Sequence, residues 1–228
     1  GVFGSSFTFD SMPLQFILMV LGALAVLSGS TIAVFQHNIK RMLGYSSVAQ
    51  IGYMILGLSL ASVSGLTATL VHLLNHALMK GGLFLAVACM AYQLGGVRLA
   101  DLAGTGQRMP WTSAAFVVGG LSLIGVPLTA GFISKWMLVV AVLETGWWPL
   151  LIVIAAGSLL TVAYIWRVIE MIYFRSAATA DGPPQEAHWS LLAPVWLLIA
   201  ANIYFGIDTQ WSVDVARLAA QLLFGVHA

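Results

Sequence analysis

The chain has 228 residues, of which 60% are hydrophobic and only 7% are charged. Soluble domains carry roughly 25% charged residues, so this composition excludes a water-soluble enzyme. The formal net charge of +1 excludes a basic surface for nucleic acid, and the single cysteine, Cys89, excludes an internal disulfide framework. The sequence starts at Gly1 without the basic segment typical of a signal peptide, and we expect it to be the back part of a longer protein.

Long apolar segments dominate the chain from one end to the other. A bilayer core of about 30 Å needs roughly 20 apolar residues in a helix. Six segments meet this requirement, namely residues 14–35, 42–61, 66–94, 111–143, 148–166 and 189–207. We therefore predict an all-α, polytopic integral membrane helix bundle with about six transmembrane helices. Residues 1–207 would form a single transmembrane domain.

The second segment carries a polar face that includes Ser46, Gln50 and Tyr53. These side chains could hold the water that a proton path needs, as a supporting polar path. The alternative is that they only form hydrogen bonds between helices. Lys40, before this segment, and Glu144, at the end of the fourth, are candidate ports for protons or cations; the alternative for Glu144 is a solvated surface carboxylate.

The third segment contains three ionisable side chains, His72, His76 and Lys80, with Asn75 beside them. Their i, i+4, i+8 spacing places them on one stripe of a helix. An ionisable group inside a span costs at least about 2.5 kcal/mol on insertion scales, so each is a functional candidate. Imidazole exchanges protons near neutral pH, and a desolvated lysine can release its proton. The stripe predicts a proton relay, although each group could instead be a single buried residue with a hydrogen-bond partner.

A metal site is a further alternative for the same segment. His72 and His76 have the spacing of the H-E-x-x-H zinc motif, but position 73 is a leucine and no third ligand is evident nearby. An intramembrane metal-dependent hydrolase is therefore the third interpretation, and we predict no bound metal.

The fourth segment is too long for one straight span, because 33 helical residues would reach about 50 Å. Pro127 removes a backbone donor and Gly131 supplies a permissive backbone, so we predict two half-helices joined near these residues. Broken helices in membranes expose backbone groups that bind ions or water. Lys135 lies just after the predicted break and is a candidate relay residue. The alternative is a proline kink with a lysine that reaches the interface.

The charges between the segments predict the orientation of the chain. Five basic residues fall on one side, namely Lys40, Arg41, Arg98, Arg108 and Arg175, whereas Arg217 alone falls on the other. The positive-inside rule then places both chain ends on the outer face. We expect the inner (cell) membrane of a bacterium as the location.

Residues 208–228 form a predicted short amphipathic C-terminal tail. Trp211, Val215, Leu218 and Leu222 recur at helical spacing, so this helix would lie on the membrane surface or dock against the bundle.

Three motifs resemble one known family. They are NIKRMLGYSSVAQIGYM, HLLNHALMKGGLFL and GVPLTAGFISKW, and their order and spacing agree with that family over roughly residues 14–175. The family is that of the antiporter-like proton-translocating subunits shared by respiratory complex I (NADH:quinone oxidoreductase) and Mrp-type multisubunit cation/proton antiporters. Membrane-bound hydrogenases carry relatives.

The resemblance implies a fold and roles for named residues. Family members have about fourteen helices, with two inverted five-helix repeats that each contain a broken helix and a buried lysine. This chain would be the second repeat plus a final helix. Lys135 would be the broken-helix lysine, and His72, His76 and Lys80 would form the central hydrophilic axis.

Two positions depart from the family pattern. Asn38 stands where an aspartate is usual, which removes a carboxylate from this entrance, and Gly44 stands where alanine is usual. Within the family, FISKWMLVVAVLETGWW and YIWRVIEMIYF are most similar to the D-type subunit of Mrp antiporters.

Together these features predict a proton-translocating membrane subunit of a multisubunit ion-pumping complex. It would relay protons along buried His and Lys side chains without a cofactor or redox centre of its own, and it would form part of an NADH:quinone oxidoreductase or an Mrp antiporter. Its partners would be other membrane subunits, the lipid bilayer, protons and, in the antiporter case, Na⁺. A non-conducting scaffold subunit of such a complex is the alternative.

Overall fold

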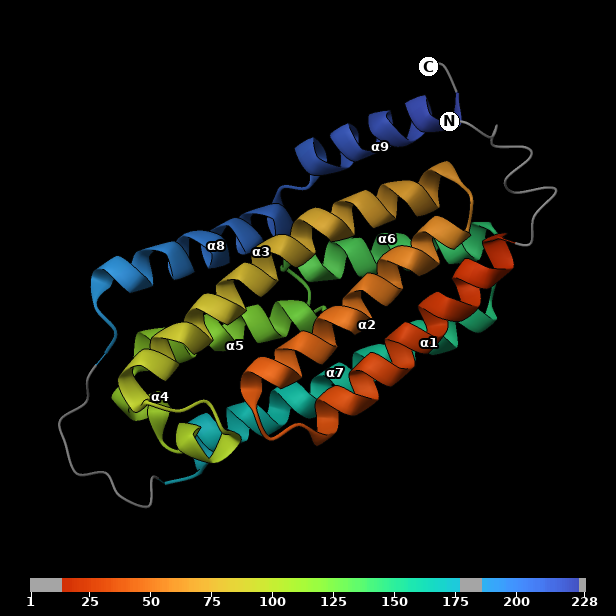
Figure 1. The fold of residues 1–228 in the computed structure, drawn as a ribbon. Coiled ribbons are helices and arrows are strands. Elements are labelled where there is room, and N and C mark those ends of the chain that lie inside the picture. Colours follow the sequence, from red (N-terminus) through yellow and green to blue (C-terminus); the bar gives the residue numbers. More distant parts are fainter. Residues whose placement is uncertain (1–13, 177–185, 226–228) are drawn as a thin grey trace.

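The computed structural model describes residues 14–176 and 186–225, and helices account for most of them. In chain order these are α1 (Leu14–Phe35), α2 (Ile39–Ser59), α3 (Val63–Leu94), the short 3-10 turn η2 (Leu99–Leu102), α4 (Thr105–Arg108), α5 (Pro110–Ile124), α6 (Ala130–Glu144), α7 (Pro149–Phe174), α8 (Trp189–Ile207) and α9 (Gln210–Phe224). The long helices run roughly along one common axis (Figure 1). The prediction of an all-α membrane helix bundle is confirmed.

The six predicted spans correspond to α1, α2, α3, the α5–α6 pair, α7 and α8. Within the described residues, α1, α3, α7 and α8 are each long and apolar enough to cross a membrane. Helix α2 has 21 residues but begins with two basic side chains and carries the polar face noted above. Helices α5 and α6 have 15 residues each, and each is therefore about 22 Å long, too short to cross the bilayer core alone.

The outside of the bundle is lined by large apolar side chains. Ile152 on α7 is 73% exposed and Leu197 on α8 is 71% exposed. They belong to a wide exposed apolar surface of a kind that soluble proteins rarely have. Such an exterior suits hydrocarbon, where the polar groups of the backbone are satisfied within the helices.

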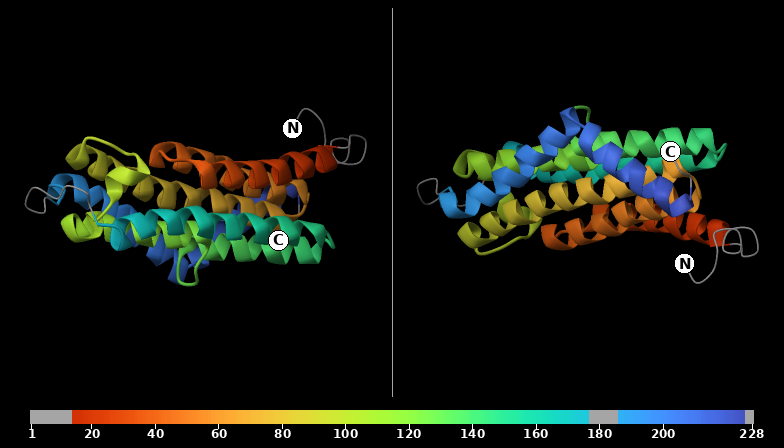
Figure 2. Two further views of the ribbon diagram at one scale, coloured as in Figure 1. Left: turned by 90° about the horizontal axis from the view of Figure 1, so that it is seen from below. Right: turned by 90° about the horizontal axis from the view of Figure 1, so that it is seen from above.

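Helix α3 is the centre of the bundle. It packs against α2, α5, α6, α8 and α9. Helices α8 and α9 lie on one side of α3, and α1 and α7 pack together on the other (Figures 1 and 2). The polar side chains of His72, Asn75 and Lys80 on α3 are thus buried among its neighbours.

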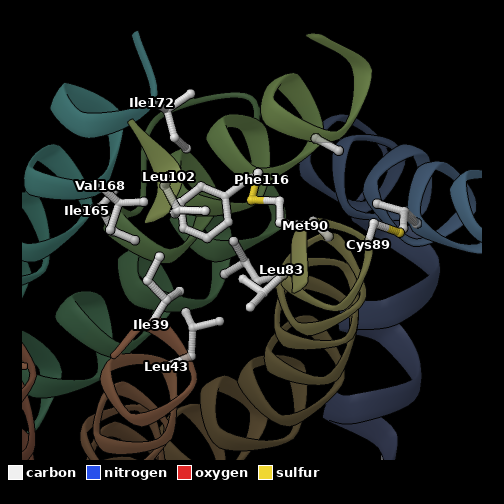
Figure 3. Close-up of a cluster of buried hydrophobic side chains, with 14 of the residues drawn as sticks. Ile39, Leu43, Leu83, Cys89, Met90, Leu102, Phe116, Ile165, Val168 and Ile172 are labelled. Carbon is white, nitrogen blue, oxygen red and sulfur yellow. The ribbon is translucent and has the colours of Figure 1, made fainter. Parts of the chain in front are cut away.

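Two apolar clusters fill the interior. The larger lies near η2 and α4 and includes Leu43, Met79 and Phe116 (Figure 3). The smaller includes Leu56 and Leu138. On α2, α3 and α7, buried polar residues occupy the positions between the members of the two clusters. We call these residues and the polar side chains next to them the polar layer: Ser46, Gln50 and Tyr53 on α2, His72, Asn75, His76 and Lys80 on α3, Ser134 and Lys135 on α6, and Ser158, Thr161 and Tyr164 on α7.

Helix α9 lies within the predicted tail and docks along α3. The small residues Ser212, Ala216 and Ala220 face the bundle and are buried. The larger apolar residues Trp211, Val215, Leu218 and Leu222 are exposed on the opposite side. Close packing of the two helices thus uses the small residues, which is the usual arrangement in membranes.

Candidate functional site: a polar layer at the helix break

The break between α5 and α6 is built from a short loop with two left-handed backbone positions. Gly125 ends α5 with φ +95°, and Leu128 has φ +72°. Pro127 lies in the connection between them. Gly131 stands in the first turn of α6, where a Cβ atom would lie 1.9 Å from the carbonyl oxygen of Ser122. The two half-helices can approach this closely only with glycine at position 131.

Lys135 reaches back from α6 to the end of α5. It is 7% exposed, and its Nζ donates to the carbonyl oxygens of Leu123 at 2.9 Å and Ile124 at 3.0 Å. Ser158 Oγ on α7 lies 3.4 Å from Nζ, and the Tyr53 ring centre lies 5.1 Å away. The last carbonyls of a helix lack intrahelical partners and form the negative end of its dipole. The break thereby supplies a place where an ammonium group can be buried without a carboxylate.

Lys80 on α3 has an equivalent environment at the larger apolar cluster. It is 5% exposed, and its Nζ donates to the carbonyl oxygen of Leu43 at 2.7 Å and to Ser46 Oγ on α2. The Phe84 ring centre lies 5.9 Å from Nζ. Both buried lysines are therefore held by carbonyl and hydroxyl oxygens.

The two histidines of the predicted stripe are neighbours on α3, with ring centres 6.4 Å apart. His72 Nδ1 lies 2.8 Å from Ser134 Oγ on α6, and its Nε2 lies 3.0 Å from Gln50 Oε1 on α2. His76 is half-buried, and its Nε2 has no hydrogen-bond partner among the described residues. The histidines share one side of α3, as their spacing predicts. The hydrogen bonds of His72, however, are made to side chains of α2 and α6 and not to the next residue of the stripe.

The start of α6 is held by three surrounding helices. Asn75 Nδ2 on α3 donates to the carbonyl oxygen of Ala130 at 2.7 Å. Ser122 Oγ on α5 accepts from the Gly131 amide at 3.1 Å and donates to Asn202 Oδ1 on α8 at 2.9 Å. These contacts fix the geometry of the break.

Several residues of the polar layer and the break were missed by the sequence reasoning. They are Ser122, Ser134, Ser158 and Asn202, which are uncharged and do not stand out as Lys and His do in an apolar helix. A search for any polar residue inside an apolar span would have found them, since α8 has only Ser190 and Asn202 as polar residues apart from its aromatic side chains.

The two candidate ports lie outside this layer. Glu144 is exposed at the end of α6, where it lines a surface cavity of about 580 Å³ together with Arg217 of α9. Lys40 is exposed in the first turn of α2. Asn38, the position where the resemblance expects an aspartate, caps α2 by accepting from the Arg41 amide at 3.2 Å. Asparagine and aspartate both perform this capping role.

A metal-binding cluster is not present in the described part of the chain, because no three His, Cys, Asp or Glu side chains lie together there. The ring nitrogens of His72 instead contact a serine and a glutamine side chain.

Comparisons with known proteins agree with the motifs. A family model described as "NADH:quinone oxidoreductase/Mrp antiporter, TM" matches residues 2–161. NADH-quinone oxidoreductase subunit N of Desulforudis audaxviator is 42% identical over 196 residues, which cover 82% of this chain and 39% of that protein. Subunit N of Acinetobacter baumannii is 34% identical over 218 residues, covering 92% of this chain and 43% of that protein.

Solved structures have the same fold. A chain of the Mrp complex from a Dietzia species superposes with a TM-score of 0.86 at 25% identity, covering 92% of this chain and 47% of that one. A chain of respiratory complex I from Thermus thermophilus superposes with a TM-score of 0.82 at 20% identity, with 92% and 45% coverage, and shows the shared fold alone. The chain thus spans less than half the length of these relatives, and it belongs to the NADH:quinone oxidoreductase/Mrp antiporter membrane family.

Proposed function

We propose that this chain is the proton-relaying part of a membrane subunit in a multisubunit ion-pumping complex of the complex I or Mrp type. Family membership supports the general role. The finer proposal is that protons pass along the polar layer, with Lys135, Lys80, His76 and His72 as relay residues.

The observation that carries the proposal is the environment of the two buried lysines. A relay residue must accept and release a proton while remaining in place. Lys80 and Lys135 each contact carbonyl and hydroxyl oxygens, which accept hydrogen bonds from the ammonium form. The salt bridge in the described residues joins Arg175 and Glu170 at the surface, so it does not hold either lysine in its charged form. Charge on one lysine would raise the cost of charging the next in this low-dielectric interior, which supplies electrostatic coupling.

Supporting groups extend the relay. Ser46, Gln50, Tyr53 and Asn75 would hold water or orient the relay residues. Buried nitrogen and oxygen atoms without a partner in the described residues include Gln50 Nε2, Asn75 Oδ1 and His76 Nε2. Buried polar atoms of this kind are normally satisfied by water. A hydrated layer would therefore satisfy them and conduct protons.

The surroundings of the relay follow from the same proposal. Protons would enter or leave near Glu144 and Lys40, both chain ends would face outward, and the location would be a bacterial inner membrane. Other hydrophobic subunits would cover polar positions at the bundle edge, and the transported ions would be protons, with Na⁺ in the antiporter case. No prosthetic group is required for hopping between side chains.

The experiment is substitution of Lys135 in the assembled complex, with ΔpH formation in inverted vesicles normalised to assembled complex. Lys135→Ala removes the titrating group and should lower transport at least about tenfold. Lys135→Arg keeps the charge, but a guanidinium is effectively always protonated, so transport should also be lost. Arg175→Lys, a basic exchange at the exposed ion pair, is the control and should be neutral. Wild-type transport by Lys135→Arg would refute the relay role and favour the scaffold subunit.

A further inference from the structure

Helix α7 contributes three buried or half-buried hydroxyl groups to the polar layer. They belong to Ser158, Thr161 and Tyr164, in a helix that is otherwise strongly apolar. Thr161 and Tyr164 are both 0% exposed. Along the chain, Ser158 and Thr161 lie between Ile154 of the smaller apolar cluster and Tyr164, which belongs to the larger one. The relay described above uses Ser158 only as a contact of Lys135 and makes no use of Thr161 or Tyr164.

One end of this row meets Lys135. Ser158 Oγ lies 3.4 Å from Lys135 Nζ. The Tyr53 hydroxyl from α2 lies close to Ser158 and donates to the carbonyl oxygen of Ile154 at 3.4 Å. Gly157 makes room for this hydroxyl, since a Cβ atom there would lie 2.4 Å from it. The absence of a side chain at Gly157 therefore lets the Tyr53 hydroxyl pack against α7 near Ser158.

The other end of the row meets the contacts of Lys80. Lys80 Nζ is hydrogen-bonded to Ser46 Oγ, and the Tyr164 hydroxyl lies close to the same serine. Tyr164 Oη donates to Thr161 Oγ1 at 3.3 Å, and Thr161 Oγ1 donates to the carbonyl oxygen of Gly157 at 2.8 Å. A series of hydroxyls thus leads from Lys80 along α7 toward Ser158.

The histidine stripe is less continuous in its hydrogen bonding. His76 Nε2 has no partner in the described residues, and the side-chain contacts of His72 are Ser134 and Gln50. Each buried lysine, by contrast, has a hydroxyl as its side-chain hydrogen-bond partner. Lys80 contacts Ser46 of α2, beyond one end of the α7 row, and Lys135 contacts Ser158, at the other end.

We propose that Ser46 on α2 and Tyr164, Thr161 and Ser158 on α7 form a hydroxyl route that carries protons between Lys80 and Lys135. The route rests on the proposed function, because it requires that both lysines exchange protons. Each hydroxyl accepts a proton on a lone pair as its own proton passes to the next oxygen, so no hydroxyl changes its net charge. Water molecules complete the steps between Ser46 and Tyr164 and between Thr161 and Ser158, two pairs that share no direct hydrogen bond. The Thr161 hydroxyl rotates from the carbonyl oxygen of Gly157 to donate along the route. The net change is loss of one proton by the Lys80 ammonium and gain of one proton by the Lys135 amine.

The test uses the assembled complex in inverted vesicles, with ΔpH formation normalised to the amount of complex. Tyr164→Phe and Thr161→Val each remove one hydroxyl while keeping a similar shape. Each should lower the rate at least about tenfold, since positioned proton transfer contributes about 100-fold or more. Thr161→Ser keeps the hydroxyl and should retain a rate near that of the wild type. Tyr173→Phe is the matched control, because Tyr173 lies on the same helix but is exposed and outside the polar layer.

The outcomes separate the two proposals. If Lys135→Arg abolishes transport while Tyr164→Phe and Thr161→Val pump normally, the hydroxyl route is wrong and the lysine relay stands. If Thr161→Ser is as impaired as Thr161→Val, packing rather than the hydroxyl matters and the route is again wrong. Wild-type transport by Lys135→Arg overturns both proposals. Loss in Tyr164→Phe and Thr161→Val, with retention in Thr161→Ser and Tyr173→Phe, supports the route.

Discussion

Substitution of Gly131 by alanine should disrupt the helix break more than any other single methyl addition near Lys135. The new Cβ would lie 1.9 Å from the carbonyl oxygen of Ser122 and 3.0 Å from its Oγ. Ordinary contacts begin at 3.4 Å, so α5 and α6 would have to separate by about 1.5 Å. The neighbour is backbone, which cannot rotate away as a flexible side chain could.

The cost has two parts. Overpacking of a close interior typically costs about 1–3 kcal/mol. Separation would also stretch the 3.1 Å hydrogen bond from the Gly131 amide to Ser122, whose loss costs about 1 kcal/mol. The total of about 2–4 kcal/mol corresponds to a roughly 30-fold to several hundred-fold shift away from the native break, at 1.4 kcal/mol for each tenfold. Lys135, which bonds to Leu123 and Ile124 across the same gap, would lose its partners.

Two measurements check this prediction: thermal stability of the detergent-solubilised complex, and ΔpH formation in inverted vesicles. Gly131→Ala should lower both. Gly44→Ala in α2 is the matched control, because a Cβ atom there would meet nothing within 4 Å. Alanine also favours helix over glycine by up to about 1 kcal/mol, so the control should be neutral or slightly stabilising. The reasoning about the break is refuted if Gly131→Ala assembles and pumps as well as Gly44→Ala.

Two further predictions concern the break and the orientation. Asn202→Leu should destabilise the complex by about 0.6 kcal/mol and by no more than about 1.7 kcal/mol, the average and the maximum for hydrogen bonds between membrane helices, because Ser122 loses its acceptor; a thermal melt equal to that of the wild type would contradict this. Single cysteine labels at Gln107 and Ser62, in a Cys89→Ala background, should react from opposite faces of sealed vesicles, with Gln107 on the cytoplasmic face. Reaction of both labels from one face would contradict the predicted topology.

Much of the fold could be predicted from hydropathy and local geometry. Apolar runs of about 20 residues locate the membrane helices because each must satisfy its backbone polar groups internally. Pro127 and Gly131 marked the discontinuity, since the first cannot donate a hydrogen bond and the second tolerates close approach. The helical period alone placed His72 and Lys80 on one face of α3.

The partners of those side chains could not be predicted in the same way. His72 and Lys80 share a stripe, yet one bonds to Ser134 and Gln50 and the other to Ser46 and a carbonyl of α2. Which hydroxyl or carbonyl lies within 3 Å depends on the rotation and register of neighbouring helices. These are set by packing of side chains that are far apart in the sequence.

The sequence by itself determined which groups had to be buried. Two apolar segments, those of α3 and α6, carry His or Lys away from their ends, and desolvation makes an ionisable group at such a position costly unless it has a partner. Only the tertiary structure decided how the cost is offset. Lys135 lies against the open carbonyl end of α5, Asn202 of α8 holds the start of α6 through Ser122, and the α7 hydroxyls extend from Lys135 toward Lys80. Each of these contacts joins segments separated by many residues, so helix packing and not local pattern brings them together.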